Sequence, residues 1–302
     1  MRVAAVVVTY NRKEELIKNI RAILSQTYII DRYYIIDNHS SDGTEELLGK
    51  EGFLKNPIIE YVYLNENIGG SGGFYTGLKM AYDDGYDFVC LMDDDGRPED
   101  NEMMKNLLEK AESIYATKKE LLLNSLVCGP ESILSFGLNG GIKTKEIAAE
   151  REENNLIVGT INPFNGTLVS KELIDSIGLP NKDFFIKGDE EDYYKRALKS
   201  GAFVATVFNS NYYHPVLERK TFKIMGRLKK GSTEAPWKEY YRARNFTYMF
   251  KRDRESIKYV RQNIRQILIA LKYNPQKLKT VKMILKGWKD GVAGKLGPSV
   301  KP

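Results

Sequence analysis

Three adjacent carboxylates, Asp93, Asp94 and Asp95, follow the apolar residues 88–92. Neighbouring negative charges repel one another, and a divalent cation would neutralise them. Carboxylate oxygens suit Mg²⁺ or Mn²⁺, and these ions also bind diphosphates. A solvated acidic turn that caps the next helix explains the triplet equally well, so the three residues alone leave a metal site and a turn as alternatives.

A second acidic cluster runs from Asp189 to Asp192, at the start of a predicted helix. The helix dipole favours acids at that position, so helix capping accounts for part of the cluster. Four acids in a row exceed what a cap requires. One of them could act as a general base if an attacking hydroxyl lies within hydrogen-bond reach.

Residues 67–74 form a glycine-rich segment between a predicted strand and a predicted helix. Glycine lets the backbone approach a ligand closely, and the N-terminus of the following helix presents free N–H groups to an anion. The segment matches neither the dinucleotide-binding fingerprint nor the phosphate loop of nucleotide hydrolases. An anion site and a plain flexible turn both remain open.

Histidine and cysteine are rare in this chain. The two cysteines, Cys90 and Cys128, make neither a disulfide framework nor a zinc cluster. The two histidines are His39, in a polar loop, and His214, just before a basic region. A lone histidine is more often structural than a ligand, so His214 becomes a metal-ligand candidate only if the fold returns it to Asp93–Asp95.

Strand and helix signals alternate over the first hundred residues. We expect strands over residues 2–8, 33–36, 59–64 and 86–92, and helices over 13–25, 41–49, 73–82 and 101–115. This alternation predicts an α/β fold with a mostly parallel sheet covered by helices on both faces. Ligands of such sheets bind at the carboxyl ends of the strands, which here carry residues 9–11, 37–40, 65–67 and 93–95.

The later part of the chain is less regular. We expect turns over residues 137–141 and 162–166, helices over 170–177 and 190–200, and a strand over 203–208. After Pro215, helical periodicity returns over residues 237–252, 255–272 and 276–288. There Arg and Lys alternate with aromatic residues, among them Trp237, Tyr240, Tyr241, Phe246, Tyr248, Phe250 and Trp288.

The charge is distributed unevenly. The net charge of the 302 residues is only +6, but residues 219–302 carry +18, from 23 bases and five acids, and the preceding residues carry −12. This asymmetry indicates a polyanionic partner, either nucleic acid or an anionic membrane. A solvated basic helical region without a partner is the alternative. There is no run of about 18 apolar residues and no signal peptide, so we expect a cytoplasmic protein without a spanning helix.

Several segments together resemble a known enzyme family. Residues 7–12, 36–44, 65–70 and 92–95, in this order and spacing, are similar to the motifs of family 2 glycosyltransferases of the GT-A fold. The resemblance covers about residues 1–215. It implies a GT-A fold and an inverting transfer of a sugar from a nucleotide-sugar donor, with Mn²⁺ or Mg²⁺ as the cofactor.

The resemblance also implies roles for individual positions. The residues that bind the nucleotide-sugar donor would be Thr9, Asn11, Asp37, Asn67, Gly69, Gly70, Asp93 and Asp94. The metal ligands would be Asp95, His214 and Asp93. Residues 188–196 are similar to the segment that carries the catalytic base of the family. This similarity places Glu190 where the family usually has an aspartate, and it leaves Asp189 as a competitor.

A narrower resemblance concerns the sugar. Residues 67–74, the triple aspartate and residues 184–189 resemble the galactofuranosyltransferase branch, which implies UDP-galactofuranose as the donor. Residues 240–245 and 286–291 are similar to both galactofuranosyltransferases and rhamnosyltransferases of surface-polysaccharide synthesis. A rhamnosyltransferase that uses dTDP-rhamnose is therefore the alternative.

These patterns predict a domain organisation and a set of partners. We expect a catalytic domain over residues 1–218 and a basic, aromatic-rich, membrane-proximal helical region over 219–302. The acceptor would be a saccharide or a lipid-linked saccharide, and the protein would lie peripherally on the inner face of the cell membrane. Formation of a homo-oligomer is left open. Nucleic acid is not expected, because no nucleic-acid-binding motif accompanies the bases. A non-catalytic sugar- or nucleic-acid-binding protein is the alternative of another class.

Overall fold

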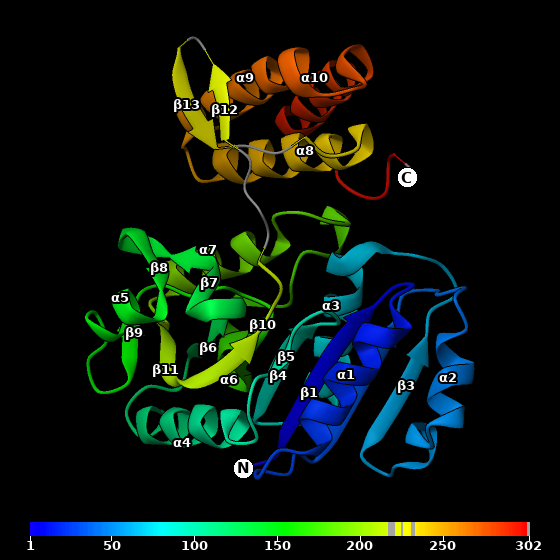
Figure 1. Ribbon diagram of the computed structural model, residues 1–302, viewed down its shortest axis with the longest axis vertical. Coiled ribbons are helices and arrows are strands. Elements are labelled where there is room, and N and C mark those ends of the chain that lie inside the picture. The colour runs from blue at the N-terminus through cyan, green and yellow to red at the C-terminus, as the bar shows by residue number, and fades with distance from the viewer. Residues whose placement is uncertain (217–220, 225, 231–232, 301–302) are drawn as a thin grey trace. The chain divides into compact units, whose positions relative to one another are not determined.

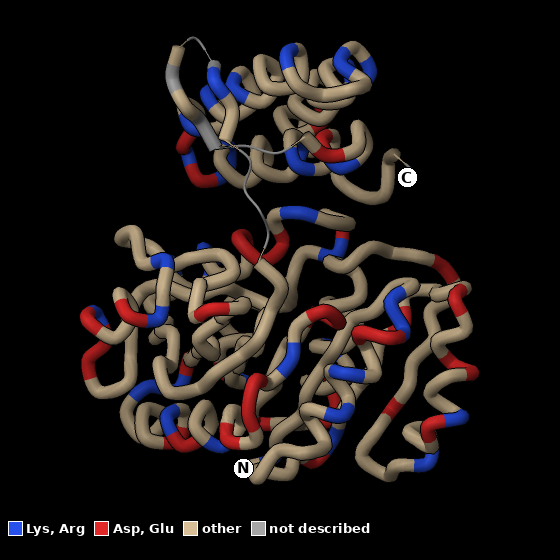
Figure 2. The backbone as a smooth tube through the Cα atoms, viewed as in Figure 1, with Lys and Arg blue, Asp and Glu red and all other residues tan. Residues whose placement is uncertain are grey.

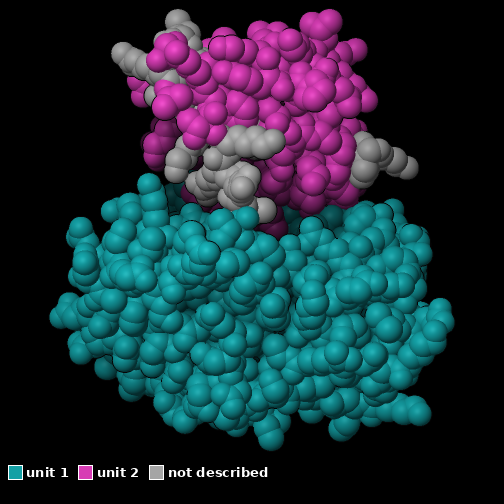
Figure 3. Space-filling model, in the orientation of Figure 1, with its two compact units in different colours: residues 1–180, 193–217 teal, residues 181–192, 218–302 magenta. Residues whose placement is uncertain are grey.

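The computed structural model describes residues 1–216, 221–224, 226–230 and 233–300. The described chain forms two compact units (Figure 3). Unit 1 comprises Met1–Pro180 and Tyr193–Leu217, and unit 2 comprises Asn181–Asp192 and Glu218–Pro302. Residues 181–192 are thus grouped with the C-terminal region. The expected catalytic domain over residues 1–218 and membrane-proximal region over 219–302 stay a prediction.

Unit 1 is built on a large sheet with the strand order β3-β2-β1-β4-β10-β6-β11-β5. Neighbouring strands among β3, β2, β1 and β4 are parallel, as are β6 and β11, whereas β10 is antiparallel to β4 and β6. This is the mostly parallel α/β sheet that the alternating pattern predicts. The strands of this path are β1 (Val3–Thr9), β2 (Arg32–Asp37), β3 (Ile59–Tyr63), β4 (Phe88–Asp93), β5 (Arg97–Pro98), β6 (Leu121–Cys128), β10 (Asn165–Ser170) and β11 (Phe203–Tyr213).

Helices cover both faces of this sheet (Figure 1). The odd-numbered residues of β1 join an apolar cluster with residues of α1 and α4, and the even-numbered residues join a second cluster with α3, α6 and α7. Burial on both faces explains why β1 is a continuous apolar run. The helices are α1 (Lys13–Leu24), α2 (Thr44–Lys50), α3 (Gly69–Asp83), α4 (Met103–Tyr115), α6 (Lys171–Ile177) and α7 (Asp189–Ser200).

The glycine-rich segment is mostly helical. Helix α3 begins at Gly69, four residues before its expected start at Gly73. A Cβ atom on Gly73 would lie 2.4 Å from a methyl group of Val8, and one on Gly77 would lie 2.3 Å from a methyl group of Val6. These glycines therefore let α3 pack closely onto β1, which a plain flexible turn would not require.

The middle of unit 1 contains strands that the sequence pattern does not predict. β6 lies between the expected elements, β10 begins within the turn expected over residues 162–166, and β11 continues five residues beyond its expected end at residue 208. Smaller elements pack beside them around a third apolar cluster. They are β7 (Ile133–Leu138), β8 (Ile142–Thr144), α5 (Lys145–Ala149) and β9 (Leu156–Val158), with 3-10 turns over Pro130–Ser132 and Asn139–Gly141. A further 3-10 turn, Phe53–Lys55, lies between α2 and β3, and Phe53 packs against the first apolar cluster.

Unit 2 consists mainly of helices α8 (Pro236–Arg252), α9 (Ser256–Tyr273) and α10 (Lys277–Ala293), close to the predicted ranges. It also contains a 3-10 turn over Lys182–Phe184 and a hairpin of β12 (Thr221–Ile224) and β13 (Arg227–Lys230). In the part of the chain that the structure describes, no helix has the length and apolar character of a membrane span. Lys and Arg lie along α9 and α10 (Figure 2).

Part of the aromatic content of unit 2 is internal. Tyr240 and Tyr241 are fully buried and pack with Phe185 in an apolar cluster. Tyr240 and Tyr241 therefore belong to the core of unit 2 and are unavailable to an external surface. Basic residues surround them in the sequence, but the side of the helix that carries them packs inward.

Candidate active site

Polar side chains gather at the carboxyl edge of β1, β2 and β4. The parallel register pairs Thr9 with Asp37 and Val8 with Asp93, so the strands end at the same edge. The Asp37 carboxylate accepts hydrogen bonds from the Tyr61 hydroxyl at 2.7 Å and from the Ser40 N–H at 2.7 Å. Asp37 is thus fixed at the position where ligands of parallel sheets bind.

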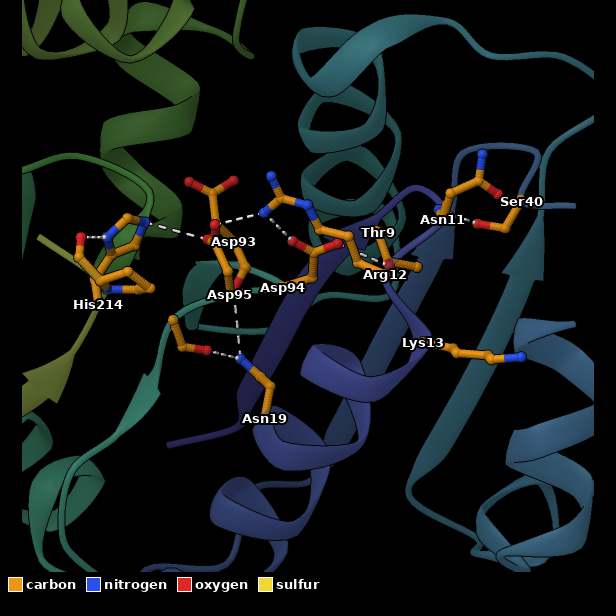
Figure 4. A network of polar contacts seen from close by, with 12 residues as sticks. Thr9, Asn11, Arg12, Lys13, Asn19, Ser40, Asp93, Asp94, Asp95 and His214 are labelled. Carbon is orange, nitrogen blue, oxygen red and sulfur yellow. Dashed lines mark hydrogen bonds and ion pairs between the residues drawn. The ribbon is translucent and has the colours of Figure 1, made fainter. Parts of the chain in front are cut away.

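Asn11 links two loops of this edge. Its N–H donates to Ser40 Oγ at 2.9 Å, and its Oδ1 accepts from the Ser41 N–H at 2.7 Å. Asn11 has a φ of 54°, a left-handed conformation that asparagine tolerates better than most residues. The predicted donor-binding residue therefore also holds the β1 and β2 loops together (Figure 4).

Asn67, Gly69 and Gly70 lie at the N-terminus of α3, after β3. The Gly69 N–H donates to Asn67 Oδ1 at 2.8 Å, and the Ile68 N–H donates to Asn38 Oδ1 at 2.9 Å. A Cβ atom on Gly70 would meet no atom within 4 Å, so there is open space beside its backbone. The first turn of α3 can therefore be approached by an anionic group.

Asp94 is the most buried member of the triplet, with 6% of its surface exposed. Its carboxylate accepts a hydrogen bond from Thr9 Oγ1 at 2.9 Å and lies 3.3 Å from Arg12 Nη1. Burial raises the pKa of Asp94 to about 6, although Arg12 and Thr9 oppose the shift. Asp94 is thus held by protein groups at the base of the site.

Asp95 lies between Arg12 and His214. Its Oδ2 forms an ion pair with Arg12 Nη1, and its Oδ1 lies 3.2 Å from His214 Nε2. Burial favours a raised pKa for Asp95, but His214 and Arg12 outweigh it and lower the pKa to about 2. The Asp95 carboxylate is therefore ionised over the physiological range and faces His214 and Arg12 (Figure 4).

The sheet topology returns His214 to the triplet. Strand β5, which follows Asp95 closely, pairs with the end of β11 so that Arg97 lies opposite Tyr213. His214 Nδ1 lies 2.8 Å from the backbone carbonyl of Pro215, a partner that directs Nε2 toward Asp95. Burial opposes protonation of His214, but Asp95 outweighs it and raises the pKa of the imidazole.

Asp95 and His214 fit a divalent cation that is shared with a diphosphate. A carboxylate oxygen and an imidazole nitrogen are suitable ligands for Mn²⁺, and Mg²⁺ commonly binds one or two carboxylates together with substrate phosphates. Among the described residues, no group of three or more His, Cys, Asp or Glu residues converges as a metal cluster. Asp93, the third predicted ligand, is half-buried at the end of β4 and does not complete such a cluster.

A cavity of about 520 Å³ lies beside this pair within unit 1. Its lining combines acidic and basic side chains from α1 with residues that follow β4 and end β11. They are Asn11, Arg12, Glu14, Glu15, Lys18, Asp95, Arg97, Tyr213 and Pro215. Arg12 was missed by the sequence analysis, although it ends the motif of residues 7–12.

The second acidic cluster forms the first turn of α7, in unit 2. Asp189 is 5% exposed and Asp192 is 1% exposed, and Asp192 pairs with Arg252. Glu190 is half-buried, and its Oε2 accepts a hydrogen bond from the Gly188 N–H at 3.1 Å. Of the two candidates for a base, Glu190 is thus more accessible than Asp189.

The fold and this site define the class of protein, an α/β protein with acidic groups at the carboxyl edge of a mostly parallel sheet. Residues 4–117 match the profile of glycosyl transferase family 2. The chain is 32% identical over 254 residues to galactofuranosyltransferase GlfT1 of Mycobacterium tuberculosis strain H37Rv, covering 82% of this chain and 81% of the relative. The chain belongs to glycosyl transferase family 2 and is a glycosyltransferase. The non-catalytic alternative is therefore wrong.

Other relatives share the fold or the family. The chain is 22% identical to the dTDP-rhamnosyl transferase RfbF of Shigella flexneri, over 97% of this chain and 96% of the relative. S. aureus TarS 1-349 in complex with UDP-GlcNAc superposes with a TM-score of 0.60 at 13% identity, covering 98% of this chain and 84% of the TarS 1-349 chain. The Pyrobaculum calidifontis mannosyltransferase PcManGT, in complex with GDP-Man and Mn²⁺, gives 0.55 at 16% identity, covering 97% and 73%. These structures confirm the GT-A-like fold.

Proposed function

We propose that this glycosyltransferase moves galactofuranose from UDP-galactofuranose to a saccharide acceptor in cell-surface polysaccharide synthesis. The observation that carries the proposal is the similarity to galactofuranosyltransferase GlfT1 across four fifths of both chains. The donor would bind at the carboxyl edge of the sheet, with Thr9, Asn11 and Asp37 on the nucleotide. The remaining donor-binding residues would be Asn67, Gly69, Gly70, Asp93 and Asp94.

Asp95 and His214 are the proposed ligands of Mn²⁺ or Mg²⁺, with Asp93 as a further candidate. The support is the 3.2 Å separation between Asp95 Oδ1 and His214 Nε2, together with the Pro215 carbonyl that orients the imidazole. A bound cation supplies Lewis-acid stabilisation of the negative charge on a diphosphate leaving group. Mn²⁺ is present with the sugar nucleotide in the PcManGT structure.

Glu190 is the proposed general base, and Asp189 is the competitor. The acceptor hydroxyl oxygen forms a bond to the anomeric carbon while the bond from that carbon to the diphosphate oxygen breaks on the opposite face. The configuration therefore inverts, and the Glu190 carboxylate takes the hydroxyl proton. Its accessibility supports Glu190 over Asp189, which is buried.

The C-terminal helices are proposed to hold the enzyme at an anionic membrane surface, where a lipid-linked acceptor would lie. Helix α9 exposes Ile257, Ile264 and Leu271, and α10 exposes Leu278, Leu285 and Val292. Side chains seven residues apart share one side of a helix, so each helix has an exposed apolar stripe. Exposed bases accompany the stripes, namely Lys258, Arg261, Arg265, Lys272, Lys277, Lys279, Lys282, Lys286 and Lys289. Apolar side chains flanked by bases suit an anionic lipid surface.

Transfer of rhamnose from dTDP-rhamnose is the second candidate, because RfbF aligns with nearly the whole chain. Thermal-shift measurements with UDP, dTDP and GDP, each with and without Mn²⁺, distinguish galactofuranosyl transfer from rhamnosyl transfer. A ligand that binds the native state raises the melting temperature by mass action. The galactofuranosyl proposal expects the largest rise with UDP and Mn²⁺, and a larger rise with dTDP would replace it by the rhamnosyl proposal.

A further inference from the structure

The segment that leads into α7 has a strained backbone. Phe185 has φ 67° and ψ −65°, and the Ile186 N–H donates to the Phe184 carbonyl at 2.8 Å. These values define a γ-turn of the rare, strained form. Lys187 also has a positive φ, of 68°. Such conformations persist only where the surroundings hold them in place.

Two buried side chains of α8 bind this segment through its carbonyl groups. Asn245 Nδ2 lies 3.0, 2.8 and 2.8 Å from the carbonyl oxygens of Phe184, Ile186 and Lys187, which share its two N–H donors. Arg244 Nη2 donates to the carbonyls of Asp183 and Phe184 at 2.9 and 3.0 Å. Both side chains are 0% exposed. We call residues 183–188 the lead-in segment, and Arg244 with Asn245 its clamp.

Within the clamp, Arg244 orients the side chain of Asn245. Arg244 Nε donates to Asn245 Oδ1 at 2.8 Å, and this bond directs the amide nitrogen of Asn245 toward the lead-in segment. Arg244 Nη1 also donates to the Gly297 carbonyl. Gly287 and Gly291 allow α10 to contact this part of α8, because added Cβ atoms would lie 2.3 Å from the Tyr240 carbonyl oxygen and 2.4 Å from that of Arg244. The sequence segments 240–245 and 286–291 therefore pack against each other at the clamp.

A single peptide group connects the clamp to Glu190. The carbonyl of the Lys187–Gly188 peptide accepts the hydrogen bond from Asn245 at 2.8 Å. The N–H of the same peptide donates to Glu190 Oε2 at 3.1 Å. A peptide group is planar and rigid, so a rotation that moves its carbonyl also moves its N–H. Asn245 thereby determines where the hydrogen-bond partner of the Glu190 carboxylate lies.

We propose that Asn245, oriented by Arg244, is a positioning residue that fixes the Glu190 carboxylate through the Lys187–Gly188 peptide. The inference rests on the proposed function, in which Glu190 removes the proton of the acceptor hydroxyl. Without Asn245, three carbonyls lose a buried donor and the strained segment relaxes. The carboxylate then loses its fixed partner, while the donor-binding edge in unit 1 keeps its own hydrogen bonds.

The test compares Asn245→Ala with Asn263→Ala in the full chain. Asn263 is a matched control, because it is 3% exposed in the same unit and its amide nitrogen donates at 2.9 Å to Thr247 Oγ1, which lies outside the lead-in segment. Misplacement of a reacting group by about 1 Å costs on the order of 100-fold in rate. We expect Asn245→Ala to lower kcat about 100-fold, with the donor KM and UDP affinity unchanged. Equal kcat losses in the two variants at equal loss of melting temperature would overturn the proposal.

Arg244→Lys provides a second variant if Asn245→Ala does not fold. Lysine keeps the charge but cannot hold Asn245 Oδ1 and the two carbonyls together, so kcat should fall while the donor KM is unchanged. A wild-type kcat in that variant would contradict the proposal. Glu190→Gln, measured in parallel, separates this inference from the function on which it rests. If Glu190→Gln turns over normally, the base assignment is wrong. If it is inactive while Asn245→Ala matches Asn263→Ala, only the positioning role is wrong.

Discussion

His214 Nε2 lies 3.2 Å from Asp95 Oδ1, although β10 and β6 separate β4 from β11 in the sheet. Strand β5 brings Asp95 close to His214, because it follows Asp95 and pairs with the end of β11. The pair is thus a product of sheet topology, and it joins two residues that are far apart in the sequence. Its geometry is the basis of the proposed metal site.

Replacement of His214 by Ala tests that site. The variant lacks one of the two proposed metal ligands, so its affinity for UDP in the presence of Mn²⁺ should fall. Loss of an outer partner of a metal ligand costs roughly 10- to 100-fold in affinity, and loss of a ligand itself should cost more. Isothermal titration of UDP with and without Mn²⁺ measures the effect. UDP binding in the presence of a chelator serves as the control and should be unchanged. An unaltered Mn²⁺ dependence would remove His214 from the metal site.

Arg12→Gln tests whether the guanidinium and a cation stabilise the same carboxylates. Arg12 is half-exposed, so loss of its pairs with Asp94 and Asp95 should cost about 1 kcal/mol, or roughly 2–4 °C in the melting temperature of a unit of the size of unit 1. Saturating Mn²⁺ should reduce the deficit, because the cation neutralises the same oxygens. A deficit of equal size with and without Mn²⁺ would show that the two do not act on the same groups.

Glu190→Gln tests the proposed base. Glutamine keeps the shape of the side chain but cannot accept the proton of the acceptor hydroxyl, so kcat should fall by about 10²- to 10⁴-fold. Titration of UDP should give the wild-type affinity. The parallel variant Asp189→Asn should retain more activity if Glu190 is the base, and the reverse order would transfer the role to Asp189.

The exposed bases of α10 should govern membrane attachment. A variant in which Lys279, Lys282 and Lys289 are changed to Gln loses three charges, each worth about 1 kcal/mol near an anionic surface, so binding should weaken about 100-fold. Sedimentation with anionic vesicles at low salt measures this. The matched control changes three exposed lysines of unit 1, Lys50, Lys79 and Lys105, to Gln. Equal losses in the two triple variants would contradict a specific role of α10.

The parallel part of the sheet formed by β1 to β4 was predictable, because a strand buried on both faces, such as β1, leaves a continuous apolar run in the sequence. The acidic triplet was recognisable because it directly follows the apolar run of β4. The antiparallel β10 was not, since its residues begin as Asn165-Gly166-Thr167 and resemble a turn. Its place between β4 and β6 depends on long-range pairing that local sequence does not encode.

The clamp was unpredictable for a different reason. Arg244 lies in a basic region, and arginine is seldom fully buried, so its expected place was the surface. The structure buries it because backbone carbonyls of the lead-in segment and of Gly297 accept its hydrogen bonds. Only the folded chain brings those carbonyls together. Gly287 and Gly291 were a visible signal of close helix packing, but their partner on α8 was not.

The most direct test of the central claim is a transfer assay that offers UDP-galactofuranose and dTDP-rhamnose side by side, with a saccharide acceptor and Mn²⁺ or a chelator. The account predicts that UDP is released from UDP-galactofuranose with formation of a galactofuranosyl product, and that the chelator abolishes this reaction. Preferential consumption of dTDP-rhamnose, or full galactofuranosyl transfer in the chelator, would contradict it.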